Sequence, residues 1–394
     1  MVDEIVVPLH DSPMHIDRSL LSPIAQRLTM GDDVVVLYGP RQTGKTTLMR
    51  NVLATLPGKK LEINGDELRH IDALSSRDAV RLGQLVEGYD ILFIDEAQRI
   101  PEIGINLKIL HDRHPGLRIA VTGSSSFDIA RGIREPLTGR SWSRILYPIS
   151  MLELSRDLTP TELGAGLEER LVLGSYPRLW SLESRKDKET HLAELAGSYL
   201  YRDILELASI RNPRKLRDIL KLLAFQVGSE VSLSEIGRSV GMGKDTVQDY
   251  IDLLEKSFII FELGGFGKNL RSEVTRNRKY YFFDNGIRNV IVDDLRPLPG
   301  RTDTGALWEN WCIAERRKLL EYSAAPAACH FWRTYAGSEI DYLEYRDGQL
   351  SAWEFKYGTK VPRVPEPFSR EYPDAAYRVV TPENWRDFVT KVEG

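Results

Sequence analysis

The chain has 394 residues, of which 42% are hydrophobic and 28% charged, as expected for a globular protein of two or three domains. Its formal net charge of −4 excludes an overall positive field for nucleic acid, so any such contact requires a local basic patch. The chain has 2 cysteines and shows no basic, apolar leader. It also contains no run approaching the roughly 18 apolar residues that are needed to span a bilayer. These features predict a cytoplasmic protein without a membrane segment.

Helical and strand-like patterns alternate from about residue 16 to residue 147, beginning with an amphipathic helix over residues 16–30. Short apolar runs predict strands near Val34, Lys60, Ile91, Arg118 and Ile145. This alternation is typical of a doubly wound α/β domain with a parallel sheet. We place that domain at residues 1–155.

A phosphate-binding loop follows the first predicted strand. It reads G-x-x-x-x-G-K-T, the Walker A pattern, and consists of Gly39, Pro40, Arg41, Gln42, Thr43, Gly44, Lys45 and Thr46, with Thr47 opening the next helix. Glycine-permissive dihedrals let successive N–H groups surround a phosphate chain, and the helix points its positive end at the anion. We expect Lys45 to neutralise the β- and γ-phosphate oxygens and Thr46 to ligate Mg²⁺.

The apolar run at residues 91–94 ends in two acids, Asp95 and Glu96. A strand buried on both faces of a parallel sheet has this pattern, and ligands bind at its carboxyl end. This Walker B arrangement predicts that Asp95 holds the magnesium shell and that Glu96 orients or deprotonates the attacking water. The alternative is a charged strand end at the surface.

Two further residues near strand ends are candidates for catalysis. Ser124, after the strand predicted at 118–122, could contact the γ-phosphate or the attacking water, or could simply cap a helix. Arg140, before the strand near Ile145, could reach the transferring phosphate in its own chain or in a neighbouring copy of a homo-oligomer. The other interpretation makes Arg140 an ordinary surface arginine.

The middle of the chain is predicted as a helical connector at residues 156–215 and a winged helix-turn-helix at residues 216–285. Ser232 and Glu235 have capping-box spacing before a first short helix, and residues 244–255 form the second. In a DNA-binding interpretation, the second helix presents Lys244, Asp245, Thr246 and Gln248, and the following hairpin presents Lys268, Arg271, Arg276, Arg278 and Lys279. Such modules also contact proteins, so a protein partner is the alternative.

Residues 286–394 are predicted as a small α/β domain containing a hairpin at Asp347 and Gly348. A two-residue loop places Asp341 opposite Glu354 and Glu339 opposite Lys356 on one face of the hairpin. The other face is expected to point to the core and carries Ile340, Tyr342, Trp353, Phe355 and Tyr357.

Opposed carboxylates weaken a sheet unless a cation lies between them. Asp341 and Glu354 therefore predict a second divalent metal site, with Glu309 completing it and Lys356 acting as a catalytic lysine. The spacing resembles the PD-(D/E)XK nuclease core. The alternative is a cross-strand salt bridge between Glu339 and Lys356 in a domain without nuclease activity.

Taken in order, these motifs and the segments at residues 174–178, 279–286, 337–342 and 354–358 resemble a family of prokaryotic AAA-type ATPases. Its members look like fusions of a P-loop ATPase, a winged helix and a restriction-endonuclease-like domain of unassigned function. The resemblance implies ATP and Mg²⁺ as cofactors. A GTPase is disfavoured because no Asn-Lys-x-Asp tetrapeptide occurs in the chain.

Two functional hypotheses follow from these motifs. In the first, an ATP-hydrolysing enzyme acts on DNA and couples its nucleotide state to the winged helix and to a metal-dependent cut. In the second, the chain is a nucleotide-dependent switch or scaffold that binds a protein partner and has no nuclease activity.

Overall fold

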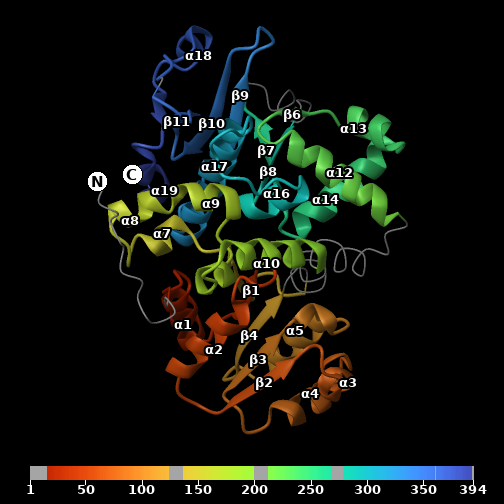
Figure 1. The fold of residues 1–394 in the computed structure, drawn as a ribbon. Helices are drawn as coiled ribbons and strands as arrows, with labels where there is room; N and C mark the ends of the chain where they lie inside the picture. Colours follow the sequence, from red (N-terminus) through yellow and green to blue (C-terminus); the bar gives the residue numbers. More distant parts are fainter. Residues whose placement is uncertain (1–15, 124–135, 199–211, 268–277, 360, 393–394) are drawn as a thin grey trace.

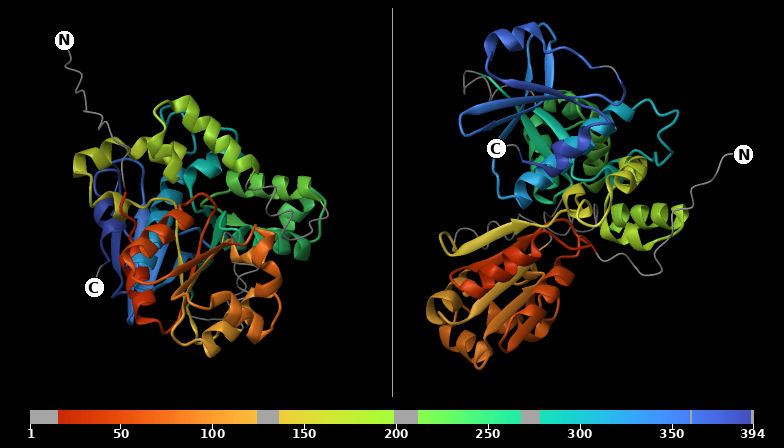
Figure 2. Two further views of the ribbon diagram at one scale, coloured as in Figure 1. Left: turned by 90° about the horizontal axis from the view of Figure 1, so that it is seen from below. Right: turned by 90° about the vertical axis from the view of Figure 1, so that its left-hand side faces the viewer.

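The computed structural model describes residues 16–123, 136–198, 212–267, 278–359 and 361–392 (Figure 1). An N-terminal body is built around one sheet and a larger C-terminal body around a second, with helix α10 (Arg185–Ser198) between them in this view. The right-hand view of Figure 2 shows the same two bodies one above the other. No helix in the described part of the chain has both the length and the apolar composition that crossing a bilayer requires.

In the part of the chain that the structure describes, the N-terminal sheet has five parallel strands in the order β2-β3-β4-β1-β5, and all five predicted strands are confirmed. The strands are β1 (Val34–Tyr38), β2 (Lys60–Asn64), β3 (Ile91–Asp95), β4 (Arg118–Gly123) and β5 (Ser141–Ile145). The main helices are α1 (Leu21–Met30), α2 (Lys45–Thr55), α4 (Ala79–Val86) and α5 (Ile103–Arg113), with the short α3 (Ile71–Leu74) before α4.

Alternate residues of β1 face two different cores. Val35 and Leu37 pack in one cluster with apolar residues of α1 and α2, whereas Val34 and Val36 pack in another with residues of α4 and α5. A continuously apolar strand therefore serves both faces of the sheet. The doubly wound α/β domain predicted from the sequence is confirmed.

The connector is helical where it is described. Helices α8 (Pro160–Ala165), α9 (Leu167–Leu173) and α10 lie within residues 156–215. Helix α7 (Met151–Leu154) ends just before this range, and α12 (Pro213–Phe225) begins at its end. Helices α7 and α8 both begin with a capping box, formed by Ser150 with Glu153 and by Thr159 with Glu162.

The two helices predicted around residue 242 occur as α13 (Leu233–Val240) and α14 (Lys244–Lys256). Ser232 caps the first by accepting from Glu235 N, and Gly241 ends it with a left-handed φ of 62°. The strands that follow, β7 (Ile260–Gly265) and β8 (Arg278–Phe282), pair antiparallel. Strand β7 also pairs in parallel with β9 (Ala328–Arg333), so these strands and the C-terminal strands share one sheet.

Within the described residues, that sheet has seven strands in the order β12-β11-β10-β9-β7-β8-β6. Its other strands are β6 (Glu230–Val231), β10 (Glu339–Arg346), β11 (Gln349–Phe355) and β12 (Ala376–Val380). Helices α16 (Asn285–Ile291), α17 (Thr304–Tyr322), α18 (Glu366–Glu371) and α19 (Trp385–Thr390) complete the C-terminal body.

The predicted hairpin register is confirmed, since Arg346 pairs with Gln349 and Tyr342 with Trp353. One expected core residue lies elsewhere. The β9–β10 pairing shifts register between Ile340 and Leu343, and Ile340 packs with Leu343 in a different cluster from Tyr342. A β-bulge at this point adds one residue to β10. The prediction assumed a strict two-residue alternation of side chains and therefore placed Ile340 on the wrong face.

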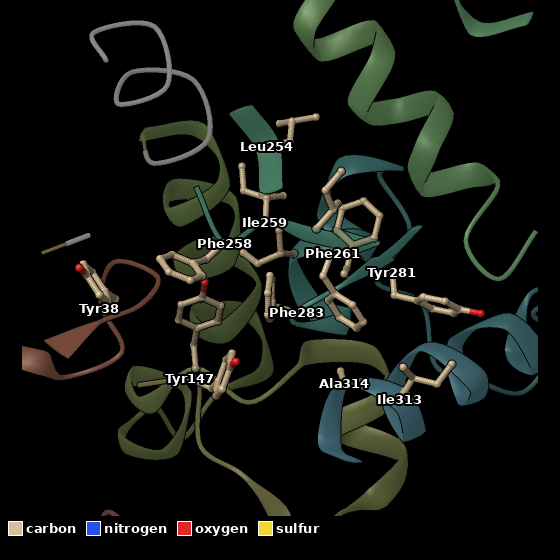
Figure 3. Close-up of a cluster of buried hydrophobic side chains, with 14 of the residues drawn as sticks. Tyr38, Tyr147, Leu254, Phe258, Ile259, Phe261, Tyr281, Phe283, Ile313 and Ala314 are labelled. Atoms are coloured by element: carbon tan, nitrogen blue, oxygen red, sulfur yellow. The ribbon is translucent and has the colours of Figure 1, made fainter. Parts of the chain in front are cut away.

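An aromatic core joins the two bodies (Figure 3). Tyr147, just after β5, stacks on Phe283, just after β8, with ring centroids 5.6 Å apart. Phe258 and Phe261 also contact the Phe283 ring, at 6.0 and 4.9 Å. The chain between β5 and α7 is therefore anchored to the C-terminal body by apolar contacts.

Candidate nucleotide-binding site

The Walker A loop leaves β1 at Gly39 and enters α2 at Lys45. Gly39 has a φ of 141°, and a Cβ there would lie 2.2 Å from Leu146 O, so only glycine fits. Gly44 is the N-cap of α2 with a φ of 89°. The loop therefore ends at the positive end of an 11-residue helix, as an anion site requires.

The Lys45 ammonium is buried in this loop, with 5% of the residue exposed. Its Nζ donates to Gly39 O at 2.9 Å and to Pro40 O at 2.8 Å. Burial lowers the pKa of Lys45 to about 8, while the nearby charges of Glu96 and Asp95 act in the opposite direction. A phosphate placed in the loop would add negative charge and favour the protonated amine.

Thr46 and Asp95, predicted as the magnesium ligands, are brought together. Thr46 Oγ1 donates to Asp95 Oδ2 at 2.8 Å, joining the first turn of α2 to the end of β3. The hydroxyl and carboxylate oxygens at this position fit Mg²⁺, which prefers oxygen ligands.

Thr122, at the end of β4, is a site residue that the sequence reasoning missed. Its hydroxyl donates to Asp95 Oδ1 and accepts from Glu96 N at 3.3 Å. The available signal was its place at the carboxyl end of a strand next to β3. The neighbouring candidate sensor, Ser124, lies outside the described residues.

Glu96 adopts a left-handed conformation with a φ of 51°, which is uncommon for a residue with a side chain. Its carboxylate accepts a hydrogen bond from Gln98 Nε2. The conformation turns the chain directly after β3, and the charges of Glu96 and Asp95 both act on Lys45.

The remaining loop residues differ in their exposure. Thr43 is fully buried and its hydroxyl donates to Pro40 O at 2.9 Å, which closes the loop on itself. Gln42 is exposed with a left-handed φ of 57°, Arg41 is partly buried, and Thr47 is exposed on the first turn of α2.

Arg140 does not lie at the phosphate loop of its own chain. Its carbonyl accepts from Val34 N at the beginning of β1, whereas the loop follows the other end of that strand. Its guanidinium donates to Asp112 at 2.8 Å, at the end of α5. The interpretation in which Arg140 acts on its own chain's nucleotide is thus wrong, because strand direction places it at the opposite edge. Action on a neighbouring copy remains a prediction.

Two of the three carboxylates predicted to bind a second metal, Glu309 and Glu354, contact lysine side chains. Lys279, only 1% exposed, contacts Glu309 at 3.4 Å and Glu339 at 2.5 Å, and Lys356 contacts Glu354 at 2.7 Å. Within the described residues, no group of three or more His, Cys, Asp or Glu side chains is arranged to hold a metal ion. The predicted metal site is therefore not supported.

Asp341, the other predicted ligand, is 8% exposed and accepts from Phe355 N at 2.8 Å. Burial raises the pKa of Asp341 and of Glu354, and the charge of Asp341 adds to the shift of Glu354. The charge of Asp341 acts on Glu354, so the two acids lie near each other, in agreement with the predicted register. The cation that contacts Glu354 is the ammonium group of Lys356.

The basic residues predicted for DNA contact are only partly placed. Lys268, Arg271 and Arg276 lie outside the described residues. Lys279 is buried and cannot contact a phosphate backbone, and Arg278 is paired with Glu262 at 2.5 Å. Helix α14 exposes Lys244 and Thr246 at its start, but its sequence KDTVQDYIDLLEK has four acidic and two basic residues.

A Walker A loop between β1 and α2, with a Walker B carboxylate at its edge, defines a P-loop ATPase domain. Comparison with family models agrees, since residues 31–155 match an AAA domain. Residues 164–296 and 304–390 match two domains of unknown function, DUF8612 and DUF4143.

Related proteins cover most of the chain. It is 30% identical over 350 residues to the uncharacterized protein Rv2008c of Mycobacterium tuberculosis, a match that covers 88% of this chain and 75% of that protein. The chain therefore belongs to the family of this mycobacterial protein. It is also 23% identical to the uncharacterized protein MJ1544 of Methanocaldococcus jannaschii, over 72% of this chain and 66% of that one.

Among solved structures, the chain is similar to the Walker-type ATPase PABY2304 of Pyrococcus abyssi. The sequence identity is 19% and the TM-score 0.49, with 70% of this chain and 96% of that one covered.

Proposed function

We propose that the chain binds ATP together with Mg²⁺ and hydrolyses it. The contact of Thr46 Oγ1 with Asp95 Oδ2 at 2.8 Å supports this most directly, because it places two oxygen ligands at the edge of the phosphate loop. Bound Mg²⁺ would neutralise charge on the β- and γ-phosphates.

The remaining groups have distinct roles in this proposal. Lys45 exchanges its bonds to Gly39 O and Pro40 O for phosphate oxygens. Glu96 positions the attacking water and accepts its proton, which requires its carboxylate to leave Gln98. Thr122 holds Asp95 in place beside the metal position. ATP is preferred to GTP because the chain has no Asn-Lys-x-Asp tetrapeptide.

Two variants separate binding from hydrolysis. Lys45→Ala removes the ammonium group of the loop, and we expect it to lose both ATP binding and turnover. Glu96→Gln should keep ATP affinity within about threefold and lower kcat at least about 100-fold, since only the proton acceptor is changed. Steady-state phosphate release and equilibrium ATP binding measure the two effects. Undiminished turnover in Lys45→Ala would refute the site.

For the C-terminal half, we propose a nucleotide-dependent switch that binds a partner and does not cleave DNA. The observation that supports it is Lys279, whose buried ammonium contacts Glu309, one of the three carboxylates that the nuclease hypothesis assigns to the metal. Incubation of DNA with Mg²⁺ or Mn²⁺ should leave it intact. Cleavage that disappears in Asp341→Ala would restore the nuclease hypothesis.

DNA association is the second candidate, favoured by the arrangement of α13 and α14 with the β7–β8 pair. It requires Lys244 at the start of α14 and the basic hairpin residues to outweigh the acids of α14. Binding to duplex DNA would then weaken steeply with salt and in Lys244→Ala. A flat salt response would favour a protein partner.

A further inference from the structure

Arg18 is a buried arginine that connects the phosphate loop to the C-terminal body. It lies just before α1, and its side chain is 12% exposed. Its guanidinium donates to three acceptors: Thr43 O in the loop at 2.6 Å, Tyr147 O at 2.6 Å and Glu153 Oε1 at 3.0 Å. The last two acceptors lie beyond β5, in the segment that joins the two bodies.

The partner carboxylate is itself rigidly held. Glu153 has a fully buried side chain, and its Oε1 also accepts from Ser19 N at 2.9 Å. Its other oxygen accepts from the amide and the hydroxyl of Ser150, both at 2.9 Å, in the capping box of α7. Because every one of these bonds fixes the carboxylate, Glu153 determines where the guanidinium lies.

The bond from Arg18 to Thr43 O sets the orientation of one peptide unit in the loop. The C=O and N–H of a trans peptide point in opposite directions, and the described chain has no cis peptide bond. With Thr43 O turned towards Arg18, the N–H of Gly44 points to the opposite side. Gly44 stands between Thr43 and Lys45, where the G-x-x-x-x-G-K-T pattern requires amides directed at phosphate.

The Arg18 guanidinium is also connected to the C-terminal body through α17. Tyr322 in the last turn of α17 accepts from Tyr147 N at 3.0 Å, and Tyr322 also interacts electrostatically with Arg18. Nearby, Glu321 accepts from Ile145 N at 3.3 Å. Helix α17 also contains Glu309 of the buried lysine–carboxylate cluster.

We propose that Arg18 is a positioning residue for nucleotide binding, which holds the Gly44 amide towards the phosphate chain from an anchor fixed by Glu153. This inference rests on the proposed ATPase function and adds how the connector controls it. Displacement of α7 or α17 relative to the loop changes the guanidinium position and thereby the ATP affinity.

The test compares Arg18→Gln, Glu153→Gln and the double variant by ATP hydrolysis in the full chain. We expect each single variant to raise KM about tenfold, because a change of that size corresponds to the loss of one charge-assisted hydrogen bond. The kcat of each should stay within about threefold of the wild-type value. The double variant should be no worse than about twice the poorer single one, because both changes break the same anchor. Arg18→Lys keeps the charge and should restore part of the affinity.

Arg27→Lys is the matched control. Arg27 lies on α1 and pairs with Asp33 before β1, away from the phosphate loop, so its KM should be that of the wild type. A merely structural role of Arg18 lowers the active fraction, which reduces apparent kcat at constant KM, and that result would overturn the proposal. An equal rise of KM in Arg27→Lys would also overturn it.

The outcome for the wild type separates this inference from the proposed function. If the wild type hydrolyses ATP and the Arg18 and Glu153 variants keep its KM, only the positioning role fails. If the wild type binds ATP without turnover, the dissociation constants replace KM in the same comparison. If it does not bind ATP at all, the proposed function fails, and the inference fails with it.

Discussion

Asp95 accepts from two threonine hydroxyls, and we expect the two threonines to affect ATP hydrolysis differently. Thr46 is expected to exchange Asp95 for Mg²⁺, whereas Thr122 holds Asp95 and the Glu96 amide throughout. Thr122→Val keeps the shape but removes the donor. We expect kcat to fall about tenfold or more and ATP affinity to change little, because the loss affects the catalytic pair.

The measurement for this prediction is steady-state ATP hydrolysis together with equilibrium ATP binding. Thr55→Val is the matched control, since the Thr55 hydroxyl donates to Val52 O at the other end of α2. Unchanged kcat in Thr122→Val, or an equal loss of kcat in Thr55→Val, would show that Thr122 has no specific role in ATP hydrolysis.

A substitution of Lys279 tests whether its ammonium group neutralises the carboxylates of Glu309 and Glu339 in the C-terminal body. Lys279→Met leaves the partly buried carboxylates of Glu309 and Glu339 without their cation, and we expect the free energy of unfolding to fall by about 1.5–3 kcal/mol. Adding Glu309→Gln to Lys279→Met should recover part of the loss. Denaturant unfolding measures both. Wild-type stability of Lys279→Met combined with newly tight Mn²⁺ binding would contradict this assignment.

Local patterns predicted that Thr46 and Asp95 lie together, for a physical reason. Each of Lys45, Thr46 and Asp95 occupies the end of an element, and the carboxyl ends of parallel strands meet at one edge. The ion pairs of Lys279 and Arg18 were not predicted, and Lys279 was expected to contact DNA, because the partners of both residues lie far away in the sequence. Only the pairing of β7 with β9 brings Lys279 to Glu339, and only the fold of the connector brings Glu153 to Arg18.

At the scale of elements, the junction of α14 with β7 contains a carboxyl group that titrates near neutrality. Burial raises the pKa of Glu255 to about 7, and the charge of Glu262 adds to the shift. A raised folded-state pKa means that the folded chain binds more protons than the unfolded chain between about pH 4.5 and 7. This group's contribution to stability therefore falls as pH rises through that window.

Glu255→Gln removes this titration but keeps an oxygen that can accept from Glu262 N. We expect the variant to gain about 1–3 kcal/mol of stability relative to the wild type when pH rises from 5 to 8. Denaturant midpoints at the two pH values provide the measurement. A constant difference between the two proteins across this range would show that Glu255 ionises normally.

Strand and helix positions were predicted from apolar periodicity, whereas two details of strand geometry were not. The bulge near Ile340 moves that side chain to another cluster, and the direction of β1 places Arg140 away from the loop. Both details depend on how neighbouring strands pair. A pattern within one strand contains no such information.

For the whole molecule, the seven-stranded sheet predicts which fragments fold. A fragment of residues 286–394 lacks β7 and β8, so β9 becomes an open edge, and Arg317 and Glu309 lose their contacts with Phe261 and Tyr281. We expect this fragment to show no cooperative thermal unfolding, in contrast to a fragment of residues 151–394 that keeps the complete sheet. Near-UV circular dichroism distinguishes them. A cooperative transition of the shorter fragment would show that the sheet divides at residue 285.

The central claim is that the loop around Lys45 binds ATP with Mg²⁺ held by Thr46 and Asp95. Calorimetric titration of the full chain with ATP, in Mg²⁺ and again in EDTA, tests it most directly. The account predicts saturable binding of one ATP per chain that weakens at least about tenfold in EDTA and is absent from Lys45→Ala. Equal affinity with and without Mg²⁺, or wild-type binding by Lys45→Ala, would contradict it.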